Sequence, residues 1–442
     1  MTTLLFLIES FIPSNFLKST YSLFSAILLF AALFYLTRIN RIIVLLLLFS
    51  GSILLVVENS SWQFALLGFG ENANLLSLFL LIPLIGTFMS TAGYLTALKE
   101  KVQERQETVG QHPYRLSFFL TATMSILLNF GSMAIVKRIA DESFSHFQHN
   151  VLTLTIMRGF ATSMLWSPYF VNVGLVLVLF DITWLDIGGY GLFLACIYIG
   201  ICILMFKRIS FDDDPVIERK QNDVKSRVSS SLYEFIAFCI VLISLSFLFD
   251  YVLPVQMLTV VSLLAVVLPL CWALSTRILG QYLHDVILQM ESSFVRLKNE
   301  LAVFISAGFL GMAMTLTEIG DHLSILLFEI SFGSVFLISV FLIIFTTLLA
   351  QIGIHPVIIL IGIGSALSPS QFGVSPEYLA LVLLIAWTVS TQLSPFSGQV
   401  LMAAKLMDKP ARTIVRQNLL FVCIVGVALT LAIYVFYLLG WL

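Results

Sequence analysis

Two short polar interruptions in long apolar runs contain residues that can bind an ion or a small solute. They are the Ser-Pro-aromatic triplets at 167–169 and 394–396. Proline removes a backbone donor and clashes with the preceding turn, so each triplet predicts a broken helix. In hydrocarbon, broken backbone must face protein or a water-filled cavity, where freed carbonyls can coordinate a cation and half-helix N-termini attract an anion. A simple proline kink is the alternative at each place.

Two further apolar stretches, 116–138 and 335–367, are interrupted near their middles. The first contains Asn-Phe-Gly at 129–131, and the second contains Gln-Ile-Gly at 351–353. The first interruption leaves an arm of about 13 residues, or ~20 Å, which is too short to cross a hydrocarbon core of ~30 Å. We therefore predict two re-entrant helical hairpins.

Hydroxyl, amide and imidazole side chains cluster at these four interruptions and are expected to form one polar chamber. The candidate substrate-binding residues are Asn129, Ser132, Arg158, Ser163, Ser167, Asn172, Gln351, His355, Thr391, Gln392, Ser394 and Ser397. A sodium site is expected near Asn129, Gly131, Ser167, Gly353 and Ser394. Each hydroxyl can instead bond a neighbouring helix, which is the usual role of Ser and Thr in membranes.

Arg158 is the only basic residue well inside a predicted crossing. Inserting it costs about 2.5–3.5 kcal/mol on translocon scales, so it should face a cavity or a partner. Its planar fork suits a carboxylate, sulfonate or phosphate group. Snorkelling to the inner headgroups or a structural ion pair is the alternative. His355 can carry a coupling proton or donate a hydrogen bond to an anion, and a structural role is equally open.

The composition excludes a water-soluble fold. Of 442 residues, 59% are hydrophobic and only 11% are charged, whereas soluble domains are about 25% charged. The formal net charge of −2 offers no basic surface for nucleic acid. The five cysteines fall in apolar runs without the spacing of a metal or redox site. We predict an all-α polytopic membrane protein whose partners are the lipid bilayer and a small solute.

Runs of about 20 apolar residues predict ten crossings besides the hairpins. Their approximate bounds are 19–37, 42–58, 73–95, 151–180, 185–206, 232–250, 253–274, 301–317, 378–407 and 419–440. If both hairpins return to the side they entered, the predicted inner loops hold every Lys and Arg except Lys18 and Arg158. Because basic loops stay cytoplasmic, this pattern favours the hairpins. It predicts a plasma (inner) membrane protein with both termini outside and a cytoplasmic central linker.

The same order of elements occurs twice, in opposite orientation. Inverted repeats of this kind are common in secondary transporters, whose sites lie between the repeats. The predicted segments are an N-terminal segment 1–18, a first repeat 19–206 with hairpin 116–138 and broken helix 151–180, a charged linker 207–231, and a second repeat 232–442 with hairpin 335–367 and broken helix 378–407.

No segment has the pattern of an ATP-binding loop, a zinc protease helix or a nucleophile elbow. Enzymatic function and direct ATP drive are therefore not expected. The only cofactor expected is a coupling ion, sodium or a proton.

The arrangement resembles the ion transporter superfamily, which includes divalent anion/sodium symporters, arsenite permeases and the membrane subunits of tripartite carriers. The resemblance spans about residues 19–442 and rests on the architecture and on polar breaks such as 127–132 and 350–353. It implies a homodimer with a dimerising scaffold, and an elevator domain made of the hairpins and broken helices. It also implies interfacial arm helices, for which Leu98 to Gln111 and Asp321 to Ile330 are the candidates.

These observations favour a secondary active transporter that moves a small anionic solute, coupled to a sodium or proton gradient. Two alternatives remain open at this point. One is a channel or uniporter of the same fold, and the other is a flippase for a lipid carrier.

Overall fold

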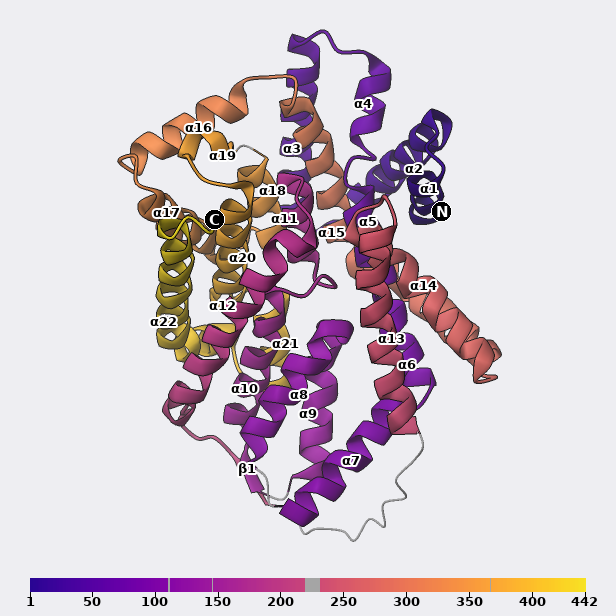
Figure 1. Cartoon of the computed structure of the whole chain (residues 1–442), viewed down its shortest axis with the longest axis vertical. Coiled ribbons are helices and arrows are strands. Elements are labelled where there is room, and N and C mark those ends of the chain that lie inside the picture. The colour runs from indigo at the N-terminus through magenta and orange to yellow at the C-terminus, as the bar shows by residue number, and fades with distance from the viewer. Residues whose placement is uncertain (110–111, 145, 219–230, 366) are drawn as a thin grey trace.

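The structure is a computed structural model that describes residues 1–109, 112–144, 146–218, 231–365 and 367–442 (Figure 1). Strands in this part of the chain are limited to β1 (His146–Gln148) and β2 (Val216–Glu218), which pair antiparallel. Nine helical segments of the described chain are long and apolar enough to span a membrane, or ten if one strongly bent pair counts as a single span. The all-α polytopic prediction is confirmed.

The first half of the chain forms helices that alternate between long crossings and short broken segments. They are α1 (Thr2–Phe11), α2 (Asn15–Leu33), α3 (Arg38–Val57), α4 (Trp62–Gly68), α5 (Ala73–Leu81), α6 (Pro83–Thr91), α7 (Tyr94–Val109), α8 (Pro113–Leu128), α9 (Gly131–Ser143), α10 (His149–Thr162), the 3-10 turn η1 (Ser163–Leu165), α11 (Val171–Phe180), α12 (Trp184–Met205) and η2 (Phe206–Arg208).

The second half repeats this alternation. Its helices are α13 (Ser231–Val252), α14 (Met257–Ser275), α15 (Leu279–Met314), α16 (Ile319–Ile330), α17 (Val335–Gln351), α18 (Pro356–Gly364), α19 (Pro369–Phe372), α20 (Pro376–Leu393), α21 (Gly398–Met407) and α22 (Ala411–Leu438).

The stretch 151–180 has the expected break, because α10 ends at Thr162 and α11 starts at Val171, and neither part alone is long enough to span. One predicted element differs from the structure. The stretch 275–300, predicted as a loop from its charges, belongs from Leu279 onward to the 36-residue helix α15. An amphipathic helix can carry such charges on one face. Of the predicted linker 207–231, residues 219–230 lie outside the described chain, as does the end of the first predicted arm at 110–111.

Local sequence explains where both hairpins turn. Hairpin 1 is α8 and α9, and it turns at Asn129, which has a positive φ of 48° with a ψ of −135°, a backbone conformation uncommon for residues other than glycine. Hairpin 2 is α17 and α18, and it turns over 352–355, where Gly353 has a φ of 96°. Pro356 then starts α18 at the first helical position, where its missing N–H costs nothing.

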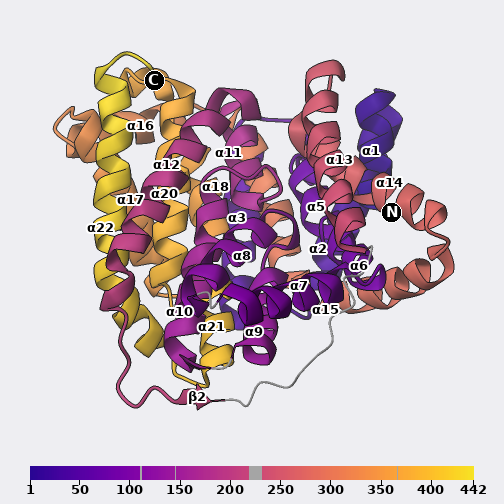
Figure 2. The same cartoon turned by 60° about the horizontal axis from the view of Figure 1, so that its bottom comes forward.

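The helices form two groups (Figure 2). In what we call the α15 group, α15 packs against α2, α3, α4, α5 and α6, and α14 packs against α5, α6 and α13. In what we call the α20 group, α20 packs against α11, α12, α17, α18, α21 and α22, while α10 packs against hairpin 1 and α21. Every residue of α20 from Tyr378 to Leu393 is buried, so this helix is the centre of its group.

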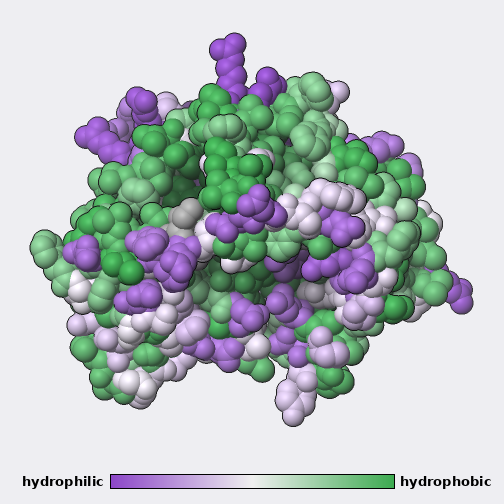
Figure 3. All heavy atoms as spheres, turned by 90° about the horizontal axis from the view of Figure 1, so that it is seen from above, coloured by the Kyte–Doolittle hydropathy of each residue, from purple (hydrophilic) through white to green (hydrophobic). Residues whose placement is uncertain are grey.

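The outer surface is largely apolar, as a bilayer requires. Large hydrophobic side chains such as Phe49 and Val56 of α3, Leu204 of α12 and Tyr233 of α13 are well exposed. Seen from the end at the top of Figure 1, apolar surface surrounds a band of hydrophilic residues and a central hollow (Figure 3).

Candidate functional site

The first helix break is tied to hairpin 1 through Ser167. Its hydroxyl lies 3.5 Å from the carbonyl of Ile126 near the hairpin turn, at the limit of a hydrogen bond, and accepts weakly from the backbone N–H of Tyr169 at 3.4 Å. One turn earlier, Ser163 Oγ is 2.7 Å from Ser125 Oγ of hairpin 1. Ser167 therefore contacts both a carbonyl of hairpin 1 and the backbone next to Pro168 that the helix break leaves unpaired.

The second break repeats this arrangement with tighter contacts. The hydroxyl of Ser394 donates to the carbonyl of Ala350 in hairpin 2 at 2.6 Å and accepts from the N–H of Phe396 at 3.2 Å. The side chain of Gln351 adds a 2.6 Å bond from its Nε2 to the carbonyl of Leu393. Equivalent serines in the two halves thus make equivalent contacts, although their sequence neighbours differ.

The two breaks also contact each other. Thr391 Oγ1 lies 3.6 Å from Met164 Sδ, and Gln399 Nε2 donates to the carbonyl of Met157 at 2.8 Å. At the tip of hairpin 1, the ring of Phe130 covers Gly398, where an added Cβ would lie 3.2 Å from that ring. The four interruptions therefore belong to one packed unit inside the α20 group.

Most of the remaining candidates are used in this packing. Ser132 Oγ donates to the carbonyl of Asn129 at 2.7 Å, and Asn172 Nδ2 donates to that of Met164 at 2.6 Å. Ser397 caps α21 and donates to the carbonyl of Thr391. These contacts fit the helix-bonding alternative for hydroxyl and amide groups.

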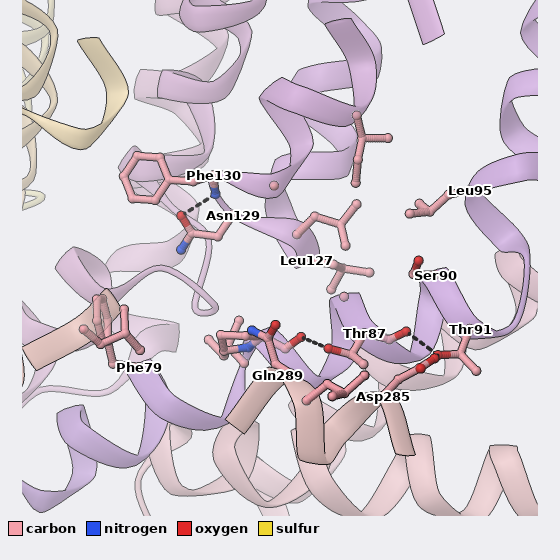
Figure 4. Close-up of a pocket in the computed structure, with 18 of the residues that line it drawn as sticks. Phe79, Thr87, Ser90, Thr91, Leu95, Leu127, Asn129, Phe130, Asp285 and Gln289 are labelled. Carbon is pink, nitrogen blue, oxygen red and sulfur yellow. Dashed lines mark hydrogen bonds between the residues drawn. The ribbon is translucent and has the colours of Figure 1, made fainter. Parts of the chain in front are cut away.

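A cavity of about 860 Å³ lies between hairpin 1 and the α15 group (Figure 4). Asn129 and Gly131 reach it from the hairpin tip, and Thr87, Ser90 and Thr91 reach it from α6. From α15 come Gln289 and Asp285, whose carboxylate accepts a 2.6 Å hydrogen bond from Thr91. We call this space the first cavity.

A second cavity, of about 370 Å³, lies between hairpin 2 and the α15 group. Gly353, His355 and Ser394 line it on one side. Asn40 of α3 and two residues of α15, Asn299 and Glu300, line it on the other. His355 Nδ1 accepts from the N–H of Val357 at 3.3 Å, so the imidazole also caps α18.

The described residues do not form the predicted single chamber. The first and second cavities lie at different hairpin tips, and the candidates divide between them and the packed interior. Asn129 and Gly131 line the first, while Gly353, His355 and Ser394 line the second. Ser163, Ser167, Asn172, Gln392 and Thr391 are buried and line neither. The reason is that the freed carbonyls are bonded by serine and glutamine side chains instead of opening toward water.

Arg158 lies apart from both cavities, between α10 and α22. It is 3% exposed, its Nε donates to Asn418 Oδ1 at 2.9 Å, and its guanidinium stacks 3.9 Å above the ring of Phe421. Its Nη1 has no partner among the described groups. Asn418 in turn lies 3.4 Å from Gln392 Oε1, which also accepts from the hydroxyl of Tyr198 at 2.8 Å. A polar network thus joins Arg158 to the second break.

Charges at the far end of hairpin 1 are paired. Glu142 forms ion pairs with Lys99 of α7 and with Arg138, whose Nε lies 2.9 Å from Glu142 Oε1. These two hydrogen bonds, first Lys99 and then Arg138, lower the pKa of the Glu142 carboxyl. The pairs join hairpin 1 to α7 beside the first cavity.

The residues that sequence reasoning missed are those of the α15 group that face the hairpin tips. Asp285, Gln289 and Glu300 were hidden in a stretch assigned to a loop. A helical reading of that stretch would have placed Asp285 and Gln289, four residues apart, on one face.

Comparison with known proteins agrees with this architecture. No family model matches the sequence, and no curated protein matches it. Among solved structures, the chain is similar to the YdaH transporter of Alcanivorax borkumensis, a protein described as having an unusual topology, with a TM-score of 0.60 and 14% identity over 83% of this chain and 86% of that one. The chain is thus a polytopic membrane protein with the fold of a membrane transporter.

The serine contacts give a direct prediction. Ser167→Ala and Ser394→Ala each remove a hydrogen bond between a hairpin and a break, at a cost of about 1 kcal/mol. Amide hydrogen exchange should rise around 126–131 in the first variant and around 350–354 in the second. Ser77→Ala is the matched control, because that buried serine bonds only the carbonyl of Ala73 in its own helix. Equal exchange in all three variants would contradict the anchoring role.

Proposed function

We propose that this protein is a secondary active transporter that moves a small anionic solute across the membrane, coupled to a sodium or proton gradient. The observation that best supports it is the matched pair of hairpin–break units. Each uses a serine to hold its hairpin, and each hairpin tip borders a cavity against the α15 group. Broken helices at the interface of inverted repeats are where secondary transporters bind their substrates.

The two helix groups suggest how access alternates. The hairpins and breaks are bonded to one another within the α20 group. The cavities lie between the hairpin tips and the α15 group, which also touches hairpin 2 directly where α15 packs against α18. Sliding of the α20 group along the α15 group would carry the hairpin tips across the bilayer while the internal contacts stay intact. This is an elevator movement, with the α15 group as scaffold and as the dimer contact.

Charge favours an anionic solute. Arg158 is buried, and its partners among the described residues are the neutral side chains of Asn418 and Phe421, so its positive charge has no described carboxylate beside it. The N-termini of α9 at Gly131 and of α18 at Pro356 border the cavities, and helix N-termini attract anions. A coupling cation near the serine and glycine positions of the breaks would balance the charge of the solute.

The cavities also indicate the side that is open. Arg138, Asp285 and Gln289 border the first cavity, and Asn40 and Asn299 border the second. All five belong to segments whose basic residues predict the cytoplasmic side. Combined with that expectation, the cavities support the proposal of an inward-open state of a plasma-membrane protein with its charged linker inside and both termini outside.

Flux measurements test the proposal directly. Purified protein in proteoliposomes is assayed across carboxylates, sulfonates, phosphate and inorganic anions, with sodium and proton gradients imposed separately. Uphill accumulation of one anion that follows one of the two gradients is the expected result. Flux that only dissipates a solute gradient would mean a channel or uniporter, and lipid translocation without anion flux would mean a flippase.

Cysteine labelling tests the inward-open assignment. Gly131→Cys and Ile354→Cys, in a background without the native cysteines, should both react with an impermeant maleimide applied on the linker side. Both positions line cavities, and an added Cβ at Gly131 has no neighbour within 4 Å. Ser132→Cys, one residue further and fully buried, is the unreactive control. Reaction of both positions only from the opposite side would reverse the assigned topology.

A further inference from the structure

Glu300 faces the tip of hairpin 2 across the second cavity. It lies on α15, which packs against α18 of the hairpin. Its Oε2 is buried and has no hydrogen-bond partner among the described residues. The preceding residue is fixed, because Asn299 Oδ1 accepts a 3.3 Å bond from the backbone N–H of Thr37. A carboxyl group is thus held at the boundary along which the two helix groups would move.

An unpaired carboxylate in this place is unfavourable. Burying an ionised carboxyl without a partner costs several kcal/mol, so such groups bind a proton or a cation. Within the described residues no three His, Cys, Asp or Glu side chains are placed to hold a metal ion. Of the other side-chain oxygens that line the cavity, Ser394 Oγ already donates to the carbonyl of Ala350 and Asn299 Oδ1 already accepts from the N–H of Thr37. A proton needs only the one free oxygen.

We infer that Glu300 binds the coupling proton of this transporter, an inference that rests on the proposed function. A hydronium ion entering the second cavity transfers its proton to Oε2, forming the O–H bond and leaving water. The neutral carboxyl then lets hairpin 2 slide past α15 without dragging a buried charge. After the movement the proton returns to water on the other side, and the carboxylate is restored.

Among the described side chains that line the second cavity, the charged or titratable ones are limited to Glu300 and one other. His355 is the other titratable side chain that lines the cavity, and it comes from hairpin 2. Arg41, near the start of α3, donates to the carbonyls of Phe34 and Leu36 and does not line the cavity. In sequence, Arg296 and Lys298 are the nearest basic residues on α15.

Infrared titration of the protein in lipid nanodiscs tests this without any solute. The wild type should show a protonated-carboxyl carbonyl band that disappears as the pH rises, and Glu300→Gln should lack it. Asp285→Asn is the control, because this carboxylate lies on the same helix but has Thr91 as a hydrogen-bond donor. The band should persist in that variant. Absence of the band from the wild type, or its persistence in Glu300→Gln, would overturn the inference.

Two additions separate this inference from its alternatives. Replacing choline chloride with sodium chloride should leave the titration unchanged, and a shift of its midpoint by sodium would overturn the assignment to a proton. In the flux assay, the anion accumulation that an imposed pH gradient drives should be at least tenfold smaller in Glu300→Gln than in the wild type. If the wild type showed the carboxyl band but no flux of any anion, the proposed function would fail while proton binding at Glu300 would stand.

Discussion

Gly191→Ala is expected to destabilise the protein strongly, although alanine is the better helix former. Gly191 lies in α12 against the first break, and an added Cβ would lie 2.3 Å from the carbonyl oxygen of Leu165 and 3.1 Å from Cβ of Trp166. The backbone of Leu165 and Trp166 cannot move away easily, because Trp184 Nε1 donates a 2.7 Å hydrogen bond to the carbonyl of Trp166. Overpacking of this kind costs about 1–3 kcal/mol, which exceeds the gain in helix propensity of at most ~1 kcal/mol.

The same helix provides matched controls. An added Cβ at Gly189 or Gly200 meets no atom within 4 Å, so alanine there should leave the unfolding temperature unchanged or raise it slightly. Thermal unfolding in detergent, followed by loss of the monodisperse elution peak, compares the three variants. A Gly191→Ala protein as stable as Gly189→Ala would show that α12 does not press on the first break as the structure has it.

Local signals in the sequence predict the hairpins and breaks well. Pro168 and Pro395 each lie where a helix is interrupted within an apolar run, and the turn residues Asn129 and Gly353 have a positive φ. The loop charges add a second, independent constraint on sidedness. The turns and breaks depend on residues that are neighbours in the chain, so the sequence alone could locate them, whereas the sidedness stays a prediction.

Contacts between distant segments could not be predicted. The partner of Ser394 is a backbone carbonyl 44 residues away, and that of Arg158 is Asn418, 260 residues away. Every residue has a backbone carbonyl, so the type of the accepting residue does not reveal such a hydrogen bond. The sequence therefore could not show whether the serines face a chamber or the hairpins. Glu300 was missed for a related reason, because a carboxylate at the end of a predicted loop looks solvated until the facing hairpin is known.

The network around Arg158 connects the two halves of the chain. Asn418 is placed between the guanidinium and Gln392, two residues before Ser394 at the second break. Removing one member of a buried hydrogen-bonded pair leaves the other unsatisfied and costs about 1–3 kcal/mol, whereas replacing both by apolar groups can be nearly neutral. The network can therefore be removed in a way that separates stability from transport.

Arg158→Gln removes the buried positive charge that we propose favours the anionic solute. A hydrogen bond to a charged group contributes about 1.5–3 kcal/mol, so loss of an interaction of this size should reduce anion flux by roughly 10–100-fold. Arg158→Lys keeps the charge but loses the planar fork and should lie between the wild type and Arg158→Gln. The double variant Arg158→Met with Asn418→Leu removes both buried partners, so its unfolding temperature should recover relative to Asn418→Leu alone. If its flux recovers as well, Arg158 only supports the packing of α10 on α22. If stability returns and flux does not, the positive charge itself is needed for the anionic solute.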